Sequence, residues 1–154
     1  MSVHDDKYAL RKVNINDINL LFSWRNDENV RKNSFNTSCV TYNEHAEWFN
    51  KKLNSSDSIM YIFEVNNISA GVIRLDKMED NSLIINYSIA KEHRGKGYSI
   101  ILLKMIKDMY NSYNLIGKVK STNIASIKAF IKAGYGFEEE ADTKIFYSSN
   151  EARG

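Results

Sequence analysis

The sequence predicts a three-layer α/β domain built around a mixed β-sheet. Three observations lead to this prediction. Apolar runs of strand length dominate both ends of the chain, segments with helical spacing lie between them, and the chain has no proline, so that asparagine and glycine supply the turns. With 154 residues, no internal repeat and no glycine- and serine-rich linker, the chain is expected to form one domain over residues 1–154.

The expected strands and helices are interleaved along the chain. Strands are expected over residues 8–13, 59–65, 68–75, 83–90 and 115–120, near residue 137, and over residues 143–148. Helices are expected from about residue 16 to 22, 42 to 53, 98 to 109 and 123 to 133.

Each of the first three helices has a start signal or an apolar face. The Asn-Asp pair at 16–17 can cap the first helix, and a polar connection begins at Trp24. Thr41 and Glu44 fit a capping box, in which two side chains accept hydrogen bonds from otherwise unpaired amides. Residues 98–109 carry apolar side chains at three- and four-residue spacing, which is typical of a helix that buries one face.

The central strands are separated by turn residues. The Asn-Asn pair at 66–67 tolerates the positive φ of a tight turn, so residues 59–65 and 68–75 are expected to form a hairpin. The polar turn at 77–82 then precedes the strand over 83–90.

Composition excludes several classes of protein. Twenty-one basic and nineteen acidic residues give a net charge of +2, which is too small to predict nucleic acid as a partner. No stretch approaches the ~20 apolar residues of a membrane span. The single cysteine, Cys39, excludes an intrachain disulfide and a thiolate-cluster metal site, and no metal is expected. Residues 1–6 are acidic and polar, so we expect no signal peptide and a cytoplasmic location.

The segment between the strand over 83–90 and the helix over 98–109 indicates an anion-binding loop. Its two glycines remove the Cβ atoms that would keep a phosphate away, and the start of the helix offers unpaired N–H groups with a partial positive charge. Basic side chains add formal charge, and the combination favours a pyrophosphate. The candidate cofactor-binding residues are Arg94, Gly95, Lys96, Gly97, Tyr98 and Ser99.

Two common phosphate-binding motifs do not fit this loop. A Walker loop requires lysine after its last glycine, whereas Gly97 is followed by Tyr98 and Ser99. A dinucleotide fingerprint requires a third glycine where Ile100 stands, and an acidic residue that residues 115–120 do not provide.

The motifs that do fit are those of the GNAT N-acetyltransferase superfamily. Arg94, Gly97 and Ser99 resemble its acyl-CoA signature R/Q-x-x-G-x-G/A, and residues 123–135 resemble its later asparagine-to-glycine-phenylalanine block. The resemblance covers nearly the whole chain. It implies a three-layer fold with about four helices and a splayed strand, and acetyl-CoA as co-substrate. Ser99 departs from the preferred glycine or alanine, and residues 134–137 replace a plain Gly-Phe pair.

The resemblance also implies roles for residues in the sheet and at the last helix. The strand before the loop would separate from its neighbour, and the backbone N–H groups of Ser88 and Ile89 would bind the acetyl carbonyl and the pantetheine. The tyrosine that donates a proton in many relatives corresponds to Phe130, which has none to give. Ser126 matches a serine proposed as the acid in the ribosomal-protein-type branch. Asn123 is a further cofactor-binding candidate, and for both residues the alternative is a role at the helix start.

The acceptor amine must be neutral to attack a thioester. An amine with the pKa of a lysine side chain, ≈ 10.4, is only about 0.04% free base at pH 7, whereas an amine with a pKa near 7.8 is about 14% free. The second kind of amine needs little help, which matters because the sequence shows no convincing general base. A sugar amine beside electron-withdrawing oxygens is expected to be less basic than lysine and suits such a site.

The N-terminal third resembles acetyltransferases of nucleotide-linked 4-amino-4,6-dideoxy sugars, which act in flagellin-glycan and related surface-polysaccharide pathways. The resemblance lies in residues 24–31, 34–36 and 44–49, and its W-R-N pattern is shared with ribosomal-protein N-terminal acetyltransferases. A nucleotide diphosphate could pair with Arg25 or Arg31, and its base could stack on an aromatic ring such as Trp48 or Tyr87. The implied substrate-binding residues are Arg25, His45 and Tyr87.

Each substrate-binding candidate has a structural alternative. Arg25 could pair with Asp27 or Glu28 in its own segment, His45 could be a packed helix residue, and Tyr87 could belong to the core because it shares a strand face with apolar neighbours.

Three functions therefore stay open at the level of sequence. The first is an N-acetyltransferase for a nucleotide-linked amino sugar. The second is an N-acetyltransferase for a protein N-terminus or a polyamine, which an acidic cleft would favour and which the acidic run at 138–140 could serve. The third is a non-catalytic acyl-CoA-binding module, which Phe130 favours. Whether the chain forms a homodimer also stays open.

Overall fold

The structure is a computed structural model that describes residues 5–148. Residues 149–154 lie outside it, and so do residues 1–4, which are part of the segment where no signal peptide is expected. Seven strands form one mixed sheet in the order β1-β2-β3-β4-β5-β7-β6. Neighbouring strands are antiparallel except β4 and β5, which are parallel. The strands are β1 (Tyr8–Lys12), β2 (Ser58–Val65), β3 (Ile68–Lys77), β4 (Ser82–Ile89), β5 (Asn114–Lys120), β6 (Gly136–Glu140) and β7 (Thr143–Tyr147). The α-helices are α1 (Ile18–Arg25), α2 (Glu28–Asn33), α3 (Tyr42–Leu53), α4 (Tyr98–Met109) and α5 (Ile124–Lys132), and the short 3-10 helices are η1 (Ile15–Asp17) and η2 (Lys91–His93).

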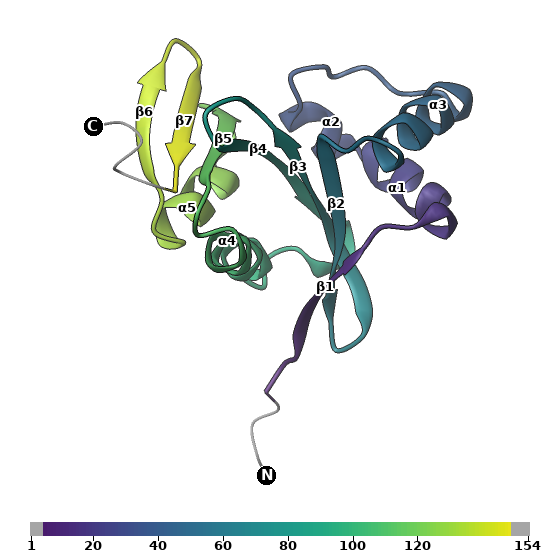
Figure 1. Ribbon diagram of the computed structural model, residues 1–154, viewed down its shortest axis with the longest axis horizontal. Helices are drawn as coiled ribbons and strands as arrows, with labels where there is room; N and C mark the ends of the chain where they lie inside the picture. The colour runs from purple at the N-terminus through teal and green to yellow at the C-terminus, as the bar shows by residue number, and fades with distance from the viewer. Residues whose placement is uncertain (1–4, 149–154) are drawn as a thin grey trace.

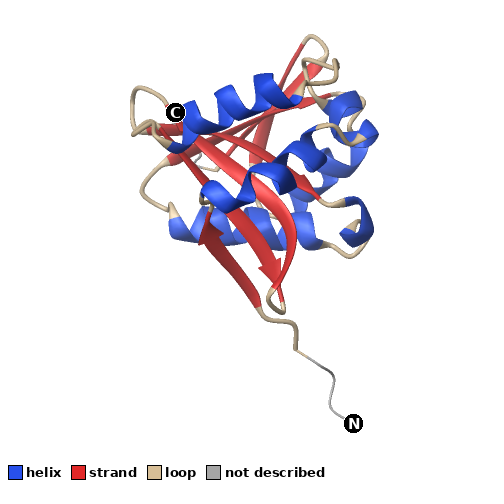
Figure 2. Ribbon diagram, turned by 90° about the vertical axis from the view of Figure 1, so that its right-hand side faces the viewer, coloured by secondary structure: helices blue, strands red, loops and turns tan. Residues whose placement is uncertain are grey.

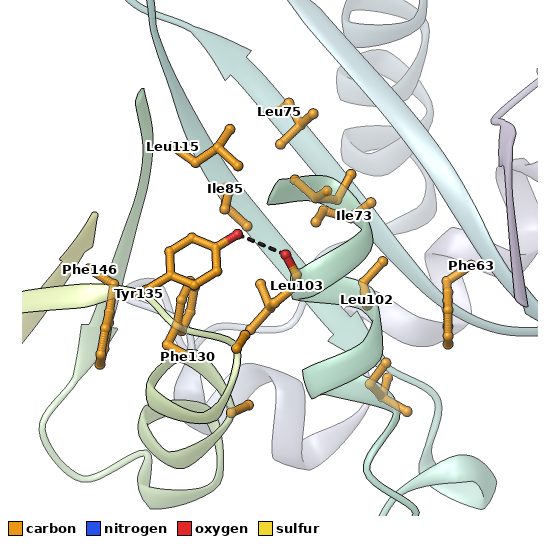
Figure 3. Packing of buried hydrophobic residues seen from close by; sticks show 14 of the residues in the cluster. Phe63, Ile73, Leu75, Ile85, Leu102, Leu103, Leu115, Phe130, Tyr135 and Phe146 are labelled. Atoms are coloured by element: carbon orange, nitrogen blue, oxygen red, sulfur yellow. Dashed lines mark hydrogen bonds between the residues drawn. The ribbon is translucent and has the colours of Figure 1, made fainter. Parts of the chain in front are cut away.

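Helices cover both faces of the sheet, which confirms the predicted three layers (Figure 1 and Figure 2). On one face, α1 and α3 pack on β2 around a smaller cluster that includes Phe49 and Ile62. On the other face, α4 and α5 pack around the larger core, which includes Leu103 and Phe130. Tyr135 joins this core and its hydroxyl donates to the Leu103 carbonyl at 2.9 Å (Figure 3). Within residues 5–148, no helix is long and apolar enough to cross a membrane.

Local signals placed most elements correctly. Thr41 Oγ1 accepts from the Glu44 amide at 3.2 Å and Glu44 Oε1 accepts from the Thr41 amide at 3.0 Å, so the capping box is confirmed. Asn66 and Asn67 have φ values of 52° and 69° in the β2–β3 turn, the left-handed region that the hairpin requires. The helix predicted over 98–109 is α4, with the same bounds.

The segment around α1 differs from the prediction in two places. A 3-10 turn precedes α1, so the capping side chain is Asn14, which accepts from the amide two residues on at 2.9 Å, and not the pair at 16–17. The connection expected from Trp24 contains the end of α1 and the short helix α2, which makes five α-helices in the described chain. α2 buries no residue, so it has no apolar pattern to detect. Asp27 starts it by accepting from the Val30 amide at 3.1 Å.

The sheet opens between β4 and β5, which confirms the predicted splayed strand. Pairing between the two strands ends at Ile85 and Gly117. Beyond that point β4 follows β3 as far as Ile89, while β5 follows β7 as far as Lys120. A gap with one wall on each half of the sheet is the result.

Asp17, the residue before α1, forms a buried ion pair with Arg11 of β1. Arg11 Nη1 and Nη2 reach Asp17 Oδ2 and Oδ1 at 2.8 and 2.9 Å, and Asp17 is only 6% exposed. The hydrogen bonds from Arg11 hold the pKa of this carboxyl below its usual value. The pair therefore stabilises the fold above the unfolded pKa, about 4, and the stabilisation is lost as the pH falls through the lower folded pKa.

We expect Asp17→Asn to lower the free energy of unfolding by about 1.5–3 kcal/mol at neutral pH, because a charged hydrogen-bonded pair is lost. The difference from the wild type is expected to shrink as the pH falls, since the wild-type carboxyl is then protonated as well. Urea unfolding over this pH range measures it, with the exposed Asp57→Asn as control. A difference that does not change with pH would contradict the assignment.

Candidate functional site

A cavity of about 810 Å³ opens at the gap between β4 and β5. Its wall is built by α1, α2, the loop that follows α2, the diverging strands β4 and β5, the first turn of α4 and one face of α5. Single residues of α3 and β2 and two of β3 complete it. The predicted site residues that line it are Arg25, Tyr87, Ser88, Ile89, Arg94, Gly95, Gly97, Tyr98, Ser99, Asn123 and Ser126. Lys96 is exposed and does not line the cavity, and His45 is buried behind it. The structure therefore brings nearly all the sequence candidates to one place.

The glycine-rich loop has the backbone that an anion cradle requires. Gly95 and Gly97 both have a φ of 78°, a conformation that favours glycine, and a Cβ added at either position would meet nothing within 4 Å. Gly97 is the N-cap of α4 and provides no side-chain hydrogen bond to the first turn. The N–H groups at the start of α4 are thus left for a ligand, with the positive end of the helix dipole behind them.

The side chain of Arg94 was predicted to bind the cofactor, but it forms its contacts within the protein instead. Its Nη2 lies 2.9 Å from Asp27 Oδ1, and its Nε donates to the Ile89 carbonyl at 3.0 Å. The Asp27 pairing neutralises the formal charge that the loop was expected to gain from this arginine. Arg94 instead joins the loop to the start of α2.

Backbone N–H groups point into the gap at alternate residues of β4. Antiparallel partners exchange hydrogen bonds at every second residue, and the Ala90 amide donates to the Ala70 carbonyl at 2.8 Å. In the same register the Ser88 amide faces β3, contrary to the expectation that it binds the acetyl group. The amides of Ile89 and Tyr87 face the gap.

Hydroxyl groups of β4 and α5 lie close together at the gap, on the side of the sheet that α4 and α5 cover. Tyr87 Oη lies 2.8 Å from Ser126 Oγ, and Ser99 is close enough to affect the pKa of Tyr87. Burial raises the pKa of Tyr87. Asn123 Oδ1 accepts from the Ser126 amide at 3.3 Å, so Asn123 has the capping role named as its alternative. Tyr87 thus faces α4 and α5, on the opposite side of the sheet from Arg25, and not the expected acceptor side.

The other end of the cavity holds an arginine that lies over an aromatic ring. Arg25 Cζ lies 4.2 Å from the centre of the Trp48 ring, and Arg74 Cζ lies 5.4 Å from the same ring. Arg25 forms no ion pair among the described residues, since Asp27 pairs with Arg94 instead. Burial, together with the charge of Arg74, lowers the pKa of Arg25.

His45 fixes the position of Arg25. Its Nε2 lies 2.8 Å from the Ile18 carbonyl, which can only accept, so Nε2 carries the proton. Nδ1 then accepts from Arg25 Nη1 at 3.2 Å. The ring is fully buried, and burial lowers the pKa of His45, which keeps it neutral. His45 therefore orients Arg25, which lines the cavity, and does not line the cavity itself.

The cavity is lined by cations and by no carboxylate. Among the described residues that line it there is no aspartate or glutamate. The basic side chains in the lining are Arg25, Arg31, Arg74, Arg94, Lys118, Lys128 and Lys132. The acidic residues 138–140 lie on β6 and do not contribute to it.

Arg74 and Phe35 line the cavity but were not among the candidates from the sequence. Arg74 lies within the apolar sequence of β3, and this charged residue could have indicated that one face of the strand is polar. Phe35 is 64% exposed on the loop after α2 and lines the cavity. It belongs to residues 34–36, which carry part of the resemblance to amino-sugar acetyltransferases, but the resemblance assigned no role to its ring.

Fold and site together define a class of protein. A glycine-rich loop at a helix start and the free amides of a splayed strand face one cavity, which is an arrangement for holding a diphosphate-bearing acyl carrier. Residues 8–136 match the acetyltransferase (GNAT) domain family. The chain belongs to this family, as the sequence motifs predicted.

Individual proteins are similar to this chain in sequence or in fold. An uncharacterised protein of Methanocaldococcus jannaschii is 25% identical over 139 residues, which cover 85% of this chain and 28% of that protein. The chain thus spans little more than a quarter of that relative. The spermidine N-acetyltransferase of Vibrio cholerae, solved with CoA and spermine, has a TM-score of 0.83 at 19% identity, covering 91% of this chain and 94% of the other. Aminoglycoside acetyltransferase AAC(6')-Ib, solved with coenzyme A and kanamycin, has a TM-score of 0.80 at 14% identity, covering 95% and 96%. Both structures confirm the fold.

Proposed function

We propose that this chain transfers the acetyl group of acetyl-CoA to the amine of an anionic acceptor, a nucleotide-linked amino-deoxysugar. The absence of any carboxylate from the described cavity lining, with two guanidinium groups beside Trp48, carries this proposal. An acceptor with several positive charges would meet only like charges here, whereas a diphosphate would find paired donors.

The described residues suit acetyl-CoA at the gap. The diphosphate would lie on the open backbone of Gly95 and Gly97 and the first turn of α4. The gap-facing amides of Tyr87 and Ile89 would bind the pantetheine and stabilise the oxyanion that forms on the acetyl carbonyl. The thioester supplies the activated acetyl group.

The acceptor end suits a nucleotide. Arg25 is held by His45 with unused donors, and a guanidinium group can bind a phosphate through two parallel N–H bonds. Trp48 is covered by Arg25 and Tyr87 is committed to Ser126, so neither suits the base. The exposed ring of Phe35 on the cavity wall is the better stacking surface.

The charge of the site also favours a neutral amine. Cationic neighbours disfavour an ammonium ion and so lower its pKa. An amine with an ordinary pKa near 7.8 is about 14% free base at pH 7 in water, and a larger share of it would be free base in this cavity. This supports direct attack without a strong protein base, which fits a lining that offers no carboxylate.

A thiol-release assay with acetyl-CoA tests the proposal. The acceptor panel contains UDP- and dTDP-linked amino sugars, the same sugars without nucleotide, spermidine and short peptides. We expect turnover with the nucleotide-linked sugars and little with spermidine. Turnover with peptides or spermidine alone would exclude the amino-sugar assignment. Tight CoA binding with no turnover of any acceptor would favour a non-catalytic acyl-CoA-binding module.

Ser126→Ala is expected to lower kcat more than about tenfold with little change in the KM for acetyl-CoA, because the hydroxyl takes part in proton transfer. The helix should persist, since the capping bond from Asn123 goes to the backbone amide at 126. Steady-state rates with the best acceptor measure the effect. An unchanged kcat removes Ser126 from the mechanism.

A further inference from the structure

The hydroxyl of Tyr87 is fixed where three elements meet. Tyr87 extends from β4 just past the last β4–β5 pair, Ser126 belongs to the first turn of α5, and Ser99 belongs to the first turn of α4. A hydrogen bond of 2.8 Å joins Tyr87 Oη to Ser126 Oγ, and Ser99 lies close enough to the same hydroxyl to affect its pKa. All three residues line the cavity. A phenol hydroxyl is therefore held in the gap, where the thioester of acetyl-CoA would lie.

Phe130 cannot supply a proton at this place, because its ring carries no hydroxyl. Its Cζ, the atom that would carry a hydroxyl, points at β5, and a Cβ added at Gly117 would lie only 2.4 Å from it. The Phe130 ring is stacked on Phe146 with centroids 4.7 Å apart. It also packs edge-on against the Tyr87 ring, which it helps to orient. Phe130 is a core residue that supports Tyr87.

We infer that Tyr87 is the catalytic proton donor to the departing thiolate and that Ser126 returns the proton to it. This inference rests on the proposed acetyl transfer. In the step, the bond between the amine nitrogen and the acetyl carbon forms and the bond between that carbon and sulfur breaks. Tyr87 passes its proton to sulfur. The proton released by nitrogen reaches the phenolate oxygen through solvent and the Ser126 hydroxyl, so atoms and charge balance and the enzyme is unchanged.

The surroundings of Tyr87 support this role. Burial raises the pKa of its hydroxyl, which is therefore protonated and able to donate at neutral pH. The starts of α4 and α5 place partial positive charge beside the atoms that carry negative charge during the step. Tyr135 is a titratable group that interacts electrostatically with Tyr87. Its hydroxyl donates to the Leu103 carbonyl, so it does not compete for the proton.

Tyr87→Phe keeps the ring and removes only the hydroxyl. We expect kcat to fall about 100-fold, within the range of general acid catalysis, and the KM for acetyl-CoA to change less than about twofold. Tyr110→Phe is the matched control, because it also removes a hydroxyl bonded to another hydroxyl, that of Tyr61 at 2.6 Å, outside the cavity lining. An unchanged kcat in Tyr87→Phe overturns the inference.

A second measurement does not need an acceptor. The ultraviolet absorbance of the thiolate reports the ionisation of CoA bound to the protein. A hydrogen bond from Tyr87 to sulfur favours the thiolate, so we expect the acid dissociation constant of the bound thiol to be about tenfold smaller in Tyr87→Phe than in the wild type. Equal constants in the two proteins overturn the inference. Failure of every acceptor in the panel would defeat the proposed function, while this titration would still decide the role of Tyr87.

Discussion

Arg25→Ala is expected to lower kcat/KM for a nucleotide-linked acceptor about 100-fold, almost entirely through a higher KM. Arg25 has no ion pair among the described residues and lies over the Trp48 ring, held there by the buried ring of His45. Its loss removes charge-assisted hydrogen bonds to a phosphate, worth about 1.5–3 kcal/mol, or about 10- to 150-fold in affinity. Because these bonds form in the ground state and persist in the transition state, kcat should change little.

Steady-state kinetics with saturating acetyl-CoA measures this effect. Arg25→Lys keeps the charge but loses the planar pair of donors, and an intermediate loss is expected. Lys51→Ala, at an exposed position of α3, is the control for a lost positive charge outside the cavity. A fall in kcat at constant KM would place Arg25 in the chemical step, and an unchanged KM for the nucleotide-linked acceptor would remove it from the acceptor site.

Gly117→Ala is expected to lower the free energy of unfolding by about 3 kcal/mol. The added Cβ would lie 2.4 Å from Phe130 Cζ, a distance that no packed side chain tolerates. Phe130 is 1% exposed and has little room to move, since it stacks on Phe146 and meets the Tyr135 ring edge-on. Overpacking of this kind forces either the ring or the strand to shift.

A double-mutant cycle with Phe130→Ala separates the cause from other effects of the substitution. Phe130→Ala alone should cost about 3–5 kcal/mol because it leaves a cavity. In that background we expect Gly117→Ala to cost less than about 1 kcal/mol, since the clashing ring is gone. Urea unfolding at neutral pH gives all four free energies. An equal cost in both backgrounds would show that contact with Phe130 is not the reason for glycine at this position.

Features fixed by residues close in sequence could be predicted. The capping box of Thr41 and Glu44 needs only a four-residue segment, and the bounds of α4 follow from its apolar spacing. The anion cradle likewise rests on the conformational freedom of Gly95 and Gly97, so its place at the start of α4 was visible in the sequence.

Features fixed by distant partners could not be predicted. α2 begins at Asp27, whose carboxylate pairs with Arg94, a residue 67 positions later. Strand alternation gave the core side for Tyr87 only as an alternative to substrate binding, and its partner Ser126 depends on how α5 packs. Arg74 joins the acceptor end only because β3 lies beside the helices that carry Arg25 and Trp48.

The ion pair between Arg94 and Asp27 has a thermodynamic consequence. It connects the glycine-rich loop to α2, and the loop after α2 forms part of the acceptor wall. A change in this one contact would therefore be felt at both ends of the cavity. Whatever factor CoA imposes on the affinity of the proposed acceptor by loosening or tightening that contact, the acceptor must impose the same factor on CoA.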